Sequence, residues 1–204
     1  MTASLQIPEL SFGPDGLVPV VVQDRVSGDV LMVAWANDEA LRLTALSGFA
    51  HFWSRSRRAL WLKGETSGNR LRVHALRTDC DRDTVLLVAD PEGPACHEGT
   101  RTCFGDASAT AAGVLAEVER VIDDRARERP EGSYTSKLLG KGLDHSLKKI
   151  GEEATELVLA AKGDTEERVA EEAADLLFHT LVVLKQRGVA LAEVLDVLER
   201  RRRK

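Results

Sequence analysis

The spacing of apolar residues changes near residue 105, and this change limits the folds open to the chain. Between Leu17 and Ala89 apolar residues occur in short β-branched and aromatic runs, which are typical of strands. Beyond residue 113 they recur at intervals of three and four, which is typical of amphipathic helices. A length of 204 residues is enough for two small cores. The sequence therefore predicts a strand-rich unit followed by a helical one.

The first unit, residues 1–106, is expected to be an α+β domain with an antiparallel sheet and one helix. Asn37 and Gly48 are placed to begin and end a helix over residues 38–47. Residues 26–29 are turn-rich and predict a hairpin. The strand candidates are residues 17–24, 29–35, 49–54, 59–63, 71–77 and 84–90.

The second unit, residues 114–204, is expected to be an all-α domain of four helices. The first begins near residue 114, and the second covers about residues 143–162. A third runs from Asp164, which forms a capping-box pattern with Glu167, to about Gly188, and a fourth runs from about Leu191 to the C-terminus. Small and polar residues at 107–113 predict a linker.

Charge and hydropathy exclude several classes of protein. The net charge of -5 lacks the basic excess of a non-specific nucleic-acid binder, and the terminal RRRK is expected to be a solvated helix end. No run approaches the roughly 20 apolar residues needed to cross a bilayer. The N-terminus lacks the pattern of a signal peptide. We expect a cytoplasmic protein without a nucleic-acid or membrane partner.

A basic stretch lies inside this acidic chain. Seven basic residues and one acidic residue occur from Arg55 to Arg77. Within it, residues 63–69 offer two glycines, two hydroxyls and an amide, which suit phosphate oxygens. A plain glycine-rich hairpin turn fits the same residues. The candidate phosphate-binding residues are Arg55, Lys63, Thr66, Ser67 and Asn69.

Carboxylates and thiols follow in a second pattern. Asp79, Asp81 and Asp83 alternate along the chain, so their side chains are expected to point the same way and to suit one hard cation, although such segments are also common as solvated turns. Cys80 lies among them, and Cys96 and Cys103 follow. Three thiolates would give zinc three ligands with one open position, the arrangement of a catalytic site. Three buried free thiols are the alternative.

The segments SRSRRALWLKGETSGN, DCDRD and ACHEGTRTCF together resemble phosphoribosyl-AMP cyclohydrolase of histidine biosynthesis. The resemblance implies a zinc- and magnesium-dependent hydrolase that opens the adenine six-membered ring. It implies zinc ligands at Cys80, Cys96 and Cys103, with Cys80 facing the other two across a homodimer interface. Asp79, Asp81 and Asp83 match its magnesium ligands. His97, beside a zinc ligand, is our candidate for acid/base catalysis.

Acidic residues also cluster on two expected helices of the second unit. Glu152, Glu153 and Glu156 fall on one side of the helix over 143–162. Glu172 and Asp175 share a face of the next helix with His179. Acids among apolar residues are costly unless a cation pairs with them, so a magnesium site is one interpretation. Surface charges paired along the helix are the other.

The segments SYTSKLL, KKIGEEATE and EEAADLLFH resemble phosphoribosyl-ATP pyrophosphatase, within the all-α nucleotide pyrophosphohydrolases. The resemblance implies magnesium held by Glu153, Glu156, Glu172 and Asp175, with Glu152 nearby. From charge and position, candidate phosphate partners are Lys137, Lys141 and Lys148.

These features together predict a bifunctional enzyme. The helical unit would release pyrophosphate from phosphoribosyl-ATP, and the strand-rich unit would open the adenine ring of the product, phosphoribosyl-AMP. Three alternatives stay open. The helices would serve only dimerisation, the chain would be a zinc-stabilised nucleotide-binding module, or it would be a pyrophosphatase with broad substrate choice.

Overall fold

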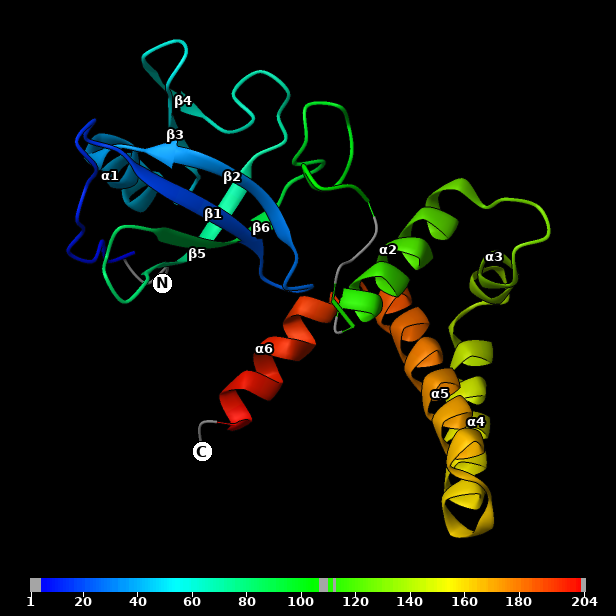
Figure 1. Cartoon of the computed structure of the whole chain (residues 1–204). Helices are drawn as coiled ribbons and strands as arrows, with labels where there is room; N and C mark the ends of the chain where they lie inside the picture. Colours follow the sequence, from blue (N-terminus) through cyan, green and yellow to red (C-terminus); the bar gives the residue numbers. More distant parts are fainter. Residues whose placement is uncertain (1–4, 107–109, 112, 203–204) are drawn as a thin grey trace. The chain divides into compact units, whose positions relative to one another are not determined.

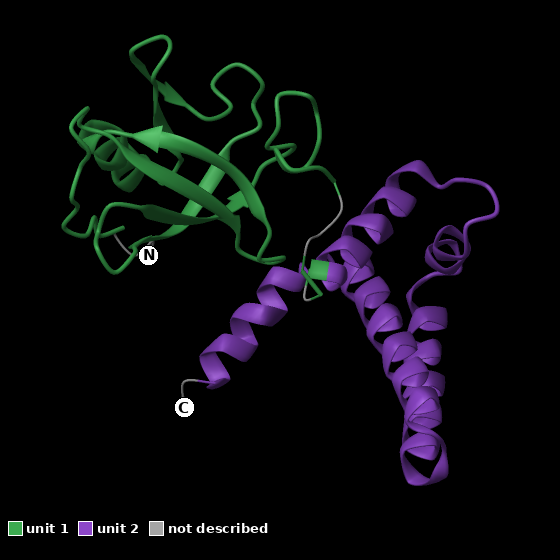
Figure 2. Cartoon of the chain, viewed as in Figure 1, with its two compact units in different colours: residues 1–113 green, residues 114–204 purple. Residues whose placement is uncertain are grey.

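The computed structural model describes residues 5–106, 110–111 and 113–202. The chain divides into two compact units, residues 1–113 and 114–204 (Figure 2). Most of the expected linker, residues 107–109 and 112, lies outside the described residues. No helix in the described part of the chain is long and apolar enough to cross a membrane.

The first unit is an α+β domain, as the sequence predicts, and Figure 1 shows its order along the chain. Asn37 accepts a hydrogen bond from the backbone of Ala40 and so caps the helix, which ends at Gly48 in a left-handed conformation with a φ of 76°. The elements are β1 (Val18–Asp24), β2 (Val30–Ala36), α1 (Asp38–Ser47), β3 (His51–Ser54), β4 (Ala59–Leu62), β5 (Leu71–Thr78) and β6 (Val85–Pro91).

The main sheet has the order β2-β1-β6-β5, and β3 and β4 form a separate pair. The expected antiparallel pairing holds for β1 with β2 and for β5 with β6. The central pair differs from the expectation, because β1 and β6 run parallel, with Val20 opposite Val85. Turn residues reveal only the pairing of neighbouring strands, whereas β1 and β6 are far apart in the sequence.

The core of this unit comes from alternate residues of β1 and β6. Val18, Val20 and Val22 are fully buried, as are Val85 and Leu87. The loops that follow β5 and β6 lie outside this core. They carry the carboxylates and thiols singled out from the sequence.

The second unit is all-helical, as predicted, but five helices occur in its described residues instead of four. The extra helix is short. It begins after Ser133, whose side chain accepts a hydrogen bond from the backbone of Ser136, a capping signal not used in the sequence prediction. The helices are α2 (Gly113–Glu128), α3 (Tyr134–Gly140), α4 (Leu143–Gly163), α5 (Glu166–Arg187) and α6 (Leu191–Arg202).

Helices α4 and α5 form an antiparallel hairpin (Figure 1). The predicted capping box at its turn is wrong. Thr165 caps α5 by accepting a hydrogen bond from the backbone of Arg168, while Asp164 ends α4. The hydroxyl of Thr165 takes the role predicted for Asp164 because the two helices turn within two residues, and the first of these must close α4.

Candidate metal centres

Three carboxylates gather where β5 ends. Ligand oxygens of Asp79, Asp81 and Asp83 all lie within 4.8 Å of one another, and all three residues are exposed. Arg82 between them takes a left-handed conformation with a φ of 66°. The three carboxylates therefore come together as predicted, but in a tight loop that follows the strand and not along an extended segment.

The backbone of this loop fixes Asp79 in particular. The backbone N–H of Thr84 donates to Asp79 Oδ1 at 3.1 Å, and the N–H of Asp79 donates to the carbonyl of Thr84 at 3.2 Å. Desolvation raises the pKa of the Asp79 carboxyl, but the hydrogen bonds from Thr84 outweigh it and bring the pKa below its ordinary value. Asp79 is therefore held in the ionised form that a hard cation needs.

Two of the three thiols lie together in the loop after β6. The side chains of Cys96 and Cys103 interact directly. A hydrogen bond from the backbone of Glu98, with one from Thr100, lowers the pKa of Cys96. Burial raises the pKa of Cys103, and the neighbouring Cys96 adds to this. The loop thus gives the two sulfurs opposite pKa shifts, and two neighbouring sulfurs fit half of a tetrahedral zinc site.

Backbone hydrogen bonds hold this loop in place. Ala95 donates to the carbonyl of Arg101 at 3.1 Å, and Cys96 donates to that of Thr100 at 3.2 Å. Cys103 donates to the carbonyl of Leu31 in β2 at 2.8 Å. The loop is therefore tied to the sheet at the position of one thiol.

Arg101 adds a buried polar anchor to the same loop. Its guanidinium pairs with Asp24 at the end of β1, at 3.2 Å, and with Asp29 just before β2. It also donates to the hydroxyl of Ser27 at 3.3 Å. The side chains of Arg101, Asp24 and Asp29 are 14%, 8% and 4% exposed. The β1–β2 turn and the thiol loop are thus joined by charges that water barely reaches.

Cys80 does not join the other two thiols within one chain. The described residues contain no group in which its ligand atom lies within 4.8 Å of those of Cys96 and Cys103. Cys80 follows β5, whereas Cys96 follows β6, and these strands are antiparallel. The strand ends from which the two segments leave are therefore separated by the length of the ladder, roughly 20 Å.

The loop over residues 63–69 lies near the thiol pair. Lys63 is buried, and its ammonium donates to the carbonyl of Asn69 at 3.2 Å. Burial lowers the pKa of Lys63, while the charges of Cys103 and Cys96 oppose that shift. The sequence predicts Lys63 in a phosphate-binding loop, and in the structure the charges of two sulfurs also act on it.

The other predicted residues of this region are at the surface. Thr66, Ser67 and Arg55 are exposed, and the guanidinium of Arg55 lies over the ring of Trp35 at 4.5 Å. His97 is exposed as well, with Nδ1 3.9 Å from Cys96 Sγ. These residues are open to a substrate.

A third group of ligands lies between α4 and α5. Ligand oxygens of Glu153, Glu156 and Glu172 are within 4.8 Å of one another. Glu153 and Glu172 are buried, at 5% and 1% exposure, whereas Glu156 is exposed. Glu172 Oε2 is buried and has no hydrogen-bond partner. A buried carboxylate oxygen without a partner is costly, and a divalent cation would satisfy it.

Cations already pair with this group. Lys149 Nζ lies 2.6 Å from Glu153 Oε1, and Arg168 pairs with Glu172. Even so, the pKa of Glu172 is raised. Desolvation is the main cause and repulsion from Glu156 adds to it, while the cation of Arg168 opposes the shift only in part. The site therefore carries more negative charge than its protein partners neutralise.

His179 completes the inner side of the group. It is 4% exposed, with Nε2 3.6 Å from Glu153 Oε1 and a buried Nδ1 that has no partner. Burial lowers its pKa. The sequence placed His179 on the acidic face but gave it no role.

Two of the predicted acids lie outside the group. Glu152 is half-buried and pairs with Lys148 at 3.4 Å and Lys149 at 3.0 Å. Asp175 is exposed, as are Lys137 and Lys141. The i, i+3 spacing that linked Asp175 to Glu172 in the sequence does not bring it to the other ligand oxygens.

Sequence reasoning missed the supporting cations Arg101 and Arg168. A signal existed for Arg168, which lies four residues before Glu172 on a helix and so faces it. No comparable signal exists for Arg101, because its partners Asp24 and Asp29 are more than 70 residues away.

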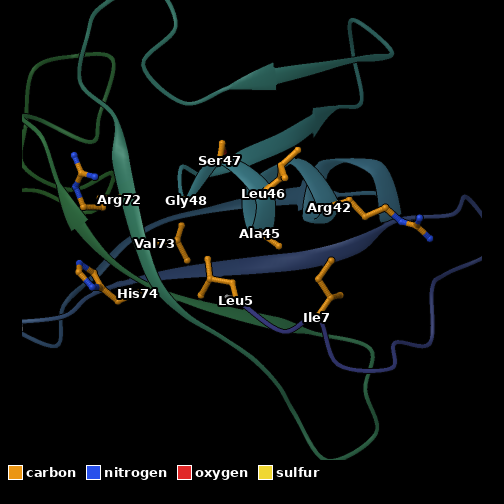
Figure 3. A pocket seen from close by; sticks show the side chains of 10 residues that line it. All are labelled: Leu5, Ile7, Arg42, Ala45, Leu46, Ser47, Gly48, Arg72, Val73 and His74. Carbon is orange, nitrogen blue, oxygen red and sulfur yellow. The ribbon is translucent and has the colours of Figure 1, made fainter. Parts of the chain in front are cut away.

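One hollow of the described surface lies apart from these groups. It encloses about 730 Å³ between α1 and β5, and Figure 3 shows its lining, which includes Leu46, Arg72 and His74. None of the metal-ligand candidates lines it. This hollow is therefore separate from the candidate metal centres.

The fold and the ligand groups together define a two-domain protein that carries candidate metal ligands in an α+β domain and in a helical hairpin, of the kinds that hydrolytic metal centres use. The phosphoribosyl-AMP cyclohydrolase family matches residues 32–105, and the phosphoribosyl-ATP pyrophosphohydrolase family matches residues 115–202. The chain belongs to the bifunctional family of histidine biosynthesis in which these two domains follow one another.

Relatives match almost from end to end. The histidine biosynthesis bifunctional protein HisIE of Bacillus subtilis is 47% identical over 201 residues, covering 96% of each chain. That of Gloeobacter violaceus is 52% identical, over 94% of this chain and 90% of the relative. That of Escherichia coli is 46% identical, over 92% of each. The predicted family is confirmed.

Proposed function

We propose that the two domains act in succession on one nucleotide. The helical domain hydrolyses phosphoribosyl-ATP to phosphoribosyl-AMP and pyrophosphate, and the α+β domain opens the adenine ring of that product. The observation that carries this proposal is the presence of separate ligand groups in separate units, each inside the residues matched by one family.

In the α+β domain, Cys96 and Cys103 would hold zinc together with Cys80 of the partner subunit. When bound, zinc supplies a hydrolytic nucleophile at neutral pH by acidifying water. His97, exposed beside Cys96, would move the proton at its imidazole. Asp79, Asp81 and Asp83 would hold magnesium. Arg55, Thr66, Ser67 and Asn69 would bind the substrate phosphates, with Lys63 between this loop and the thiols.

In the helical domain, Glu153, Glu156 and Glu172 would hold magnesium, with Glu152 and Asp175 at the margin of the site. The fit rests on the unpartnered Oε2 of Glu172. When bound, magnesium neutralises the triphosphate and activates water. The exposed lysines Lys137, Lys141 and Lys148 would attract the phosphate chain by their charge.

We also propose a homodimer in the cytoplasm. The separation of Cys80 from the other thiols supports a zinc site completed by a second subunit. All three cysteines are free thiols, which is typical of a reducing compartment.

The decisive experiment supplies purified protein with phosphoribosyl-ATP, zinc and magnesium and follows both pyrophosphate and the ring-opened product. Glu153→Gln and Glu172→Gln should abolish pyrophosphate release and spare ring opening of added phosphoribosyl-AMP. Cys96→Ser and Cys103→Ser should lose zinc and ring opening and spare pyrophosphate release. Unchanged pyrophosphate release in the glutamate variants, or full zinc retention with full ring opening in the cysteine variants, would refute the corresponding centre.

The shared zinc site has its own test. Cys80→Ser and Cys96→Ser chains, each inactive alone, are mixed and allowed to exchange subunits. A mixed dimer then has one intact site of two, so random exchange should restore roughly a quarter of the ring-opening activity. No recovery, with exchange shown by differently tagged chains, would place all three thiols in one chain.

A further inference from the structure

Two cations bracket the carboxylate group of the helical domain. Lys149 lies one turn before Glu153 on α4, and Arg168 lies one turn before Glu172 on α5. Because α4 and α5 form an antiparallel hairpin, the turn before Glu153 and the turn before Glu172 lie at opposite ends of the group (Figure 1). A positive charge therefore flanks the carboxylates on either side along the hairpin.

Both cations hold an inner carboxylate that a divalent ion would also bind. Lys149 binds Glu153 Oε1 at 2.6 Å, and Arg168 pairs with Oε1 of Glu172. A magnesium ion on the same carboxylate would lie close to the ammonium or guanidinium, and the two positive charges would repel each other. Binding of the ion and of the two side chains is therefore competitive.

Each cation also has a second partner outside the group. Lys149 reaches Glu152 Oε2 at 3.0 Å, and Arg168 reaches Glu171 Oε2 at 3.1 Å. Their side chains are 26% and 50% exposed, so each has a face open to solvent. A cation released from the inner carboxylate would stay beside the site and could reach a phosphate group bound there.

We propose that Lys149 and Arg168 are phosphate-binding residues that exchange the inner carboxylates for phosphate oxygens when a divalent cation occupies Glu153, Glu156 and Glu172. The ligand class is the phosphate chain of a nucleoside triphosphate, long enough to meet a cation on each side of the ion. The inference rests on the proposed magnesium site and adds the residues that hold the substrate there.

This exchange predicts that removing either cation changes the affinity for the metal and the affinity for phosphate in opposite directions. Without Lys149, the divalent ion has no competitor at Glu153, so its affinity rises. The phosphate chain loses a charge-assisted hydrogen bond, so its affinity falls. A lysine that merely held Glu153 in place would give the opposite result for the metal, because its loss would weaken metal binding.

The experiment measures the binding of magnesium alone, and then of inorganic pyrophosphate at saturating magnesium, by titration calorimetry on the full chain. Lys149→Gln and Arg168→Gln should each bind magnesium about fivefold more tightly. Each should bind pyrophosphate about tenfold more weakly. Matched controls remove the same charge elsewhere on the same helices, with Lys162→Gln for α4 and Arg187→Gln for α5, and should change neither affinity by as much as twofold.

Glu153→Gln and Glu172→Gln identify the part of the magnesium binding that comes from this group, and thermal melting shows that each variant is folded. If these two variants bind magnesium like the parent chain, the proposed magnesium site is wrong and the inference falls with it. If they lose binding but Lys149→Gln and Arg168→Gln weaken magnesium binding or leave pyrophosphate binding unchanged, only the inference is overturned.

Discussion

The guanidinium of Arg101 lies 3.2 Å from the carboxylate of Asp24, and both side chains are almost fully buried. This pair joins the loop that carries Cys96 and Cys103 to the first strand of the sheet. Asp24 is itself held by the turn, because its Oδ1 accepts from the backbone of Val26 at 2.8 Å and of Ser27 at 2.9 Å. The position of the thiol pair thus depends on a turn more than 70 residues earlier.

Replacing Arg101 by methionine should therefore destabilise the first domain. The change removes the cation that pairs with the buried carboxylate of Asp24, which costs about 3 kcal/mol for a buried pair. Urea unfolding followed by tryptophan fluorescence measures this loss, since Trp35, Trp53 and Trp61 all lie in that domain. Arg42→Met removes an exposed pair with Asp38 and should cost less than about 1 kcal/mol. Equal losses in the two variants would contradict the anchoring role of Arg101.

Gly64→Ala should disturb the loop that carries Lys63. A Cβ at residue 64 would lie 2.4 Å from the backbone of Asn69, and the φ of +80° adds strain for any other residue. We expect a loss of about 3 kcal/mol and a higher KM for phosphoribosyl-AMP. Gly68 has the same φ but open space around it, so Gly68→Ala should cost only about 1 kcal/mol. Similar losses in both variants would show that close packing at Gly64 is unimportant.

His97→Ala should lower the rate of ring opening about 100-fold while leaving the zinc content unchanged. In our proposal the exposed imidazole of His97, beside Cys96, moves a proton and does not bind the metal. Zinc per chain, measured by atomic absorption, separates this role from that of a ligand. Loss of zinc together with activity would make His97 a ligand or a residue that orders the loop, and would remove it from acid/base catalysis.

Glu172→Gln should raise the melting temperature of the helical domain in the presence of a chelator. The substitution removes a buried charge that Arg168 only partly compensates, and it relieves repulsion with Glu156. In the same variant, the stabilisation of the parent chain by magnesium should disappear. Differential scanning calorimetry with and without magnesium measures both effects. A lower melting temperature in chelator would show that the Arg168 pair outweighs the cost of burial.

Local patterns in the sequence determined much of this protein. The strand ranges and the helix ranges other than α3 follow from apolar spacing, and Asn37 and Gly48 mark the ends of α1 as predicted. Asp79, Asp81 and Asp83 come together as the sequence predicts, although a tight loop with a left-handed Arg82 gathers them instead of an extended segment. The helical period placed Glu153 and Glu156 on one side of α4.

Only the tertiary structure decided which distant groups meet. The parallel pairing of β1 with β6, the burial of Lys63 beside two sulfurs, and the Arg101–Asp24 pair all join residues that no local period relates. The same is true of Glu172, which joins Glu153 and Glu156 while Asp175 does not, because helix packing fixes which turn of α5 faces α4. Sequence spacing sets the direction of a side chain along its own element, whereas its partners are set by how the elements pack.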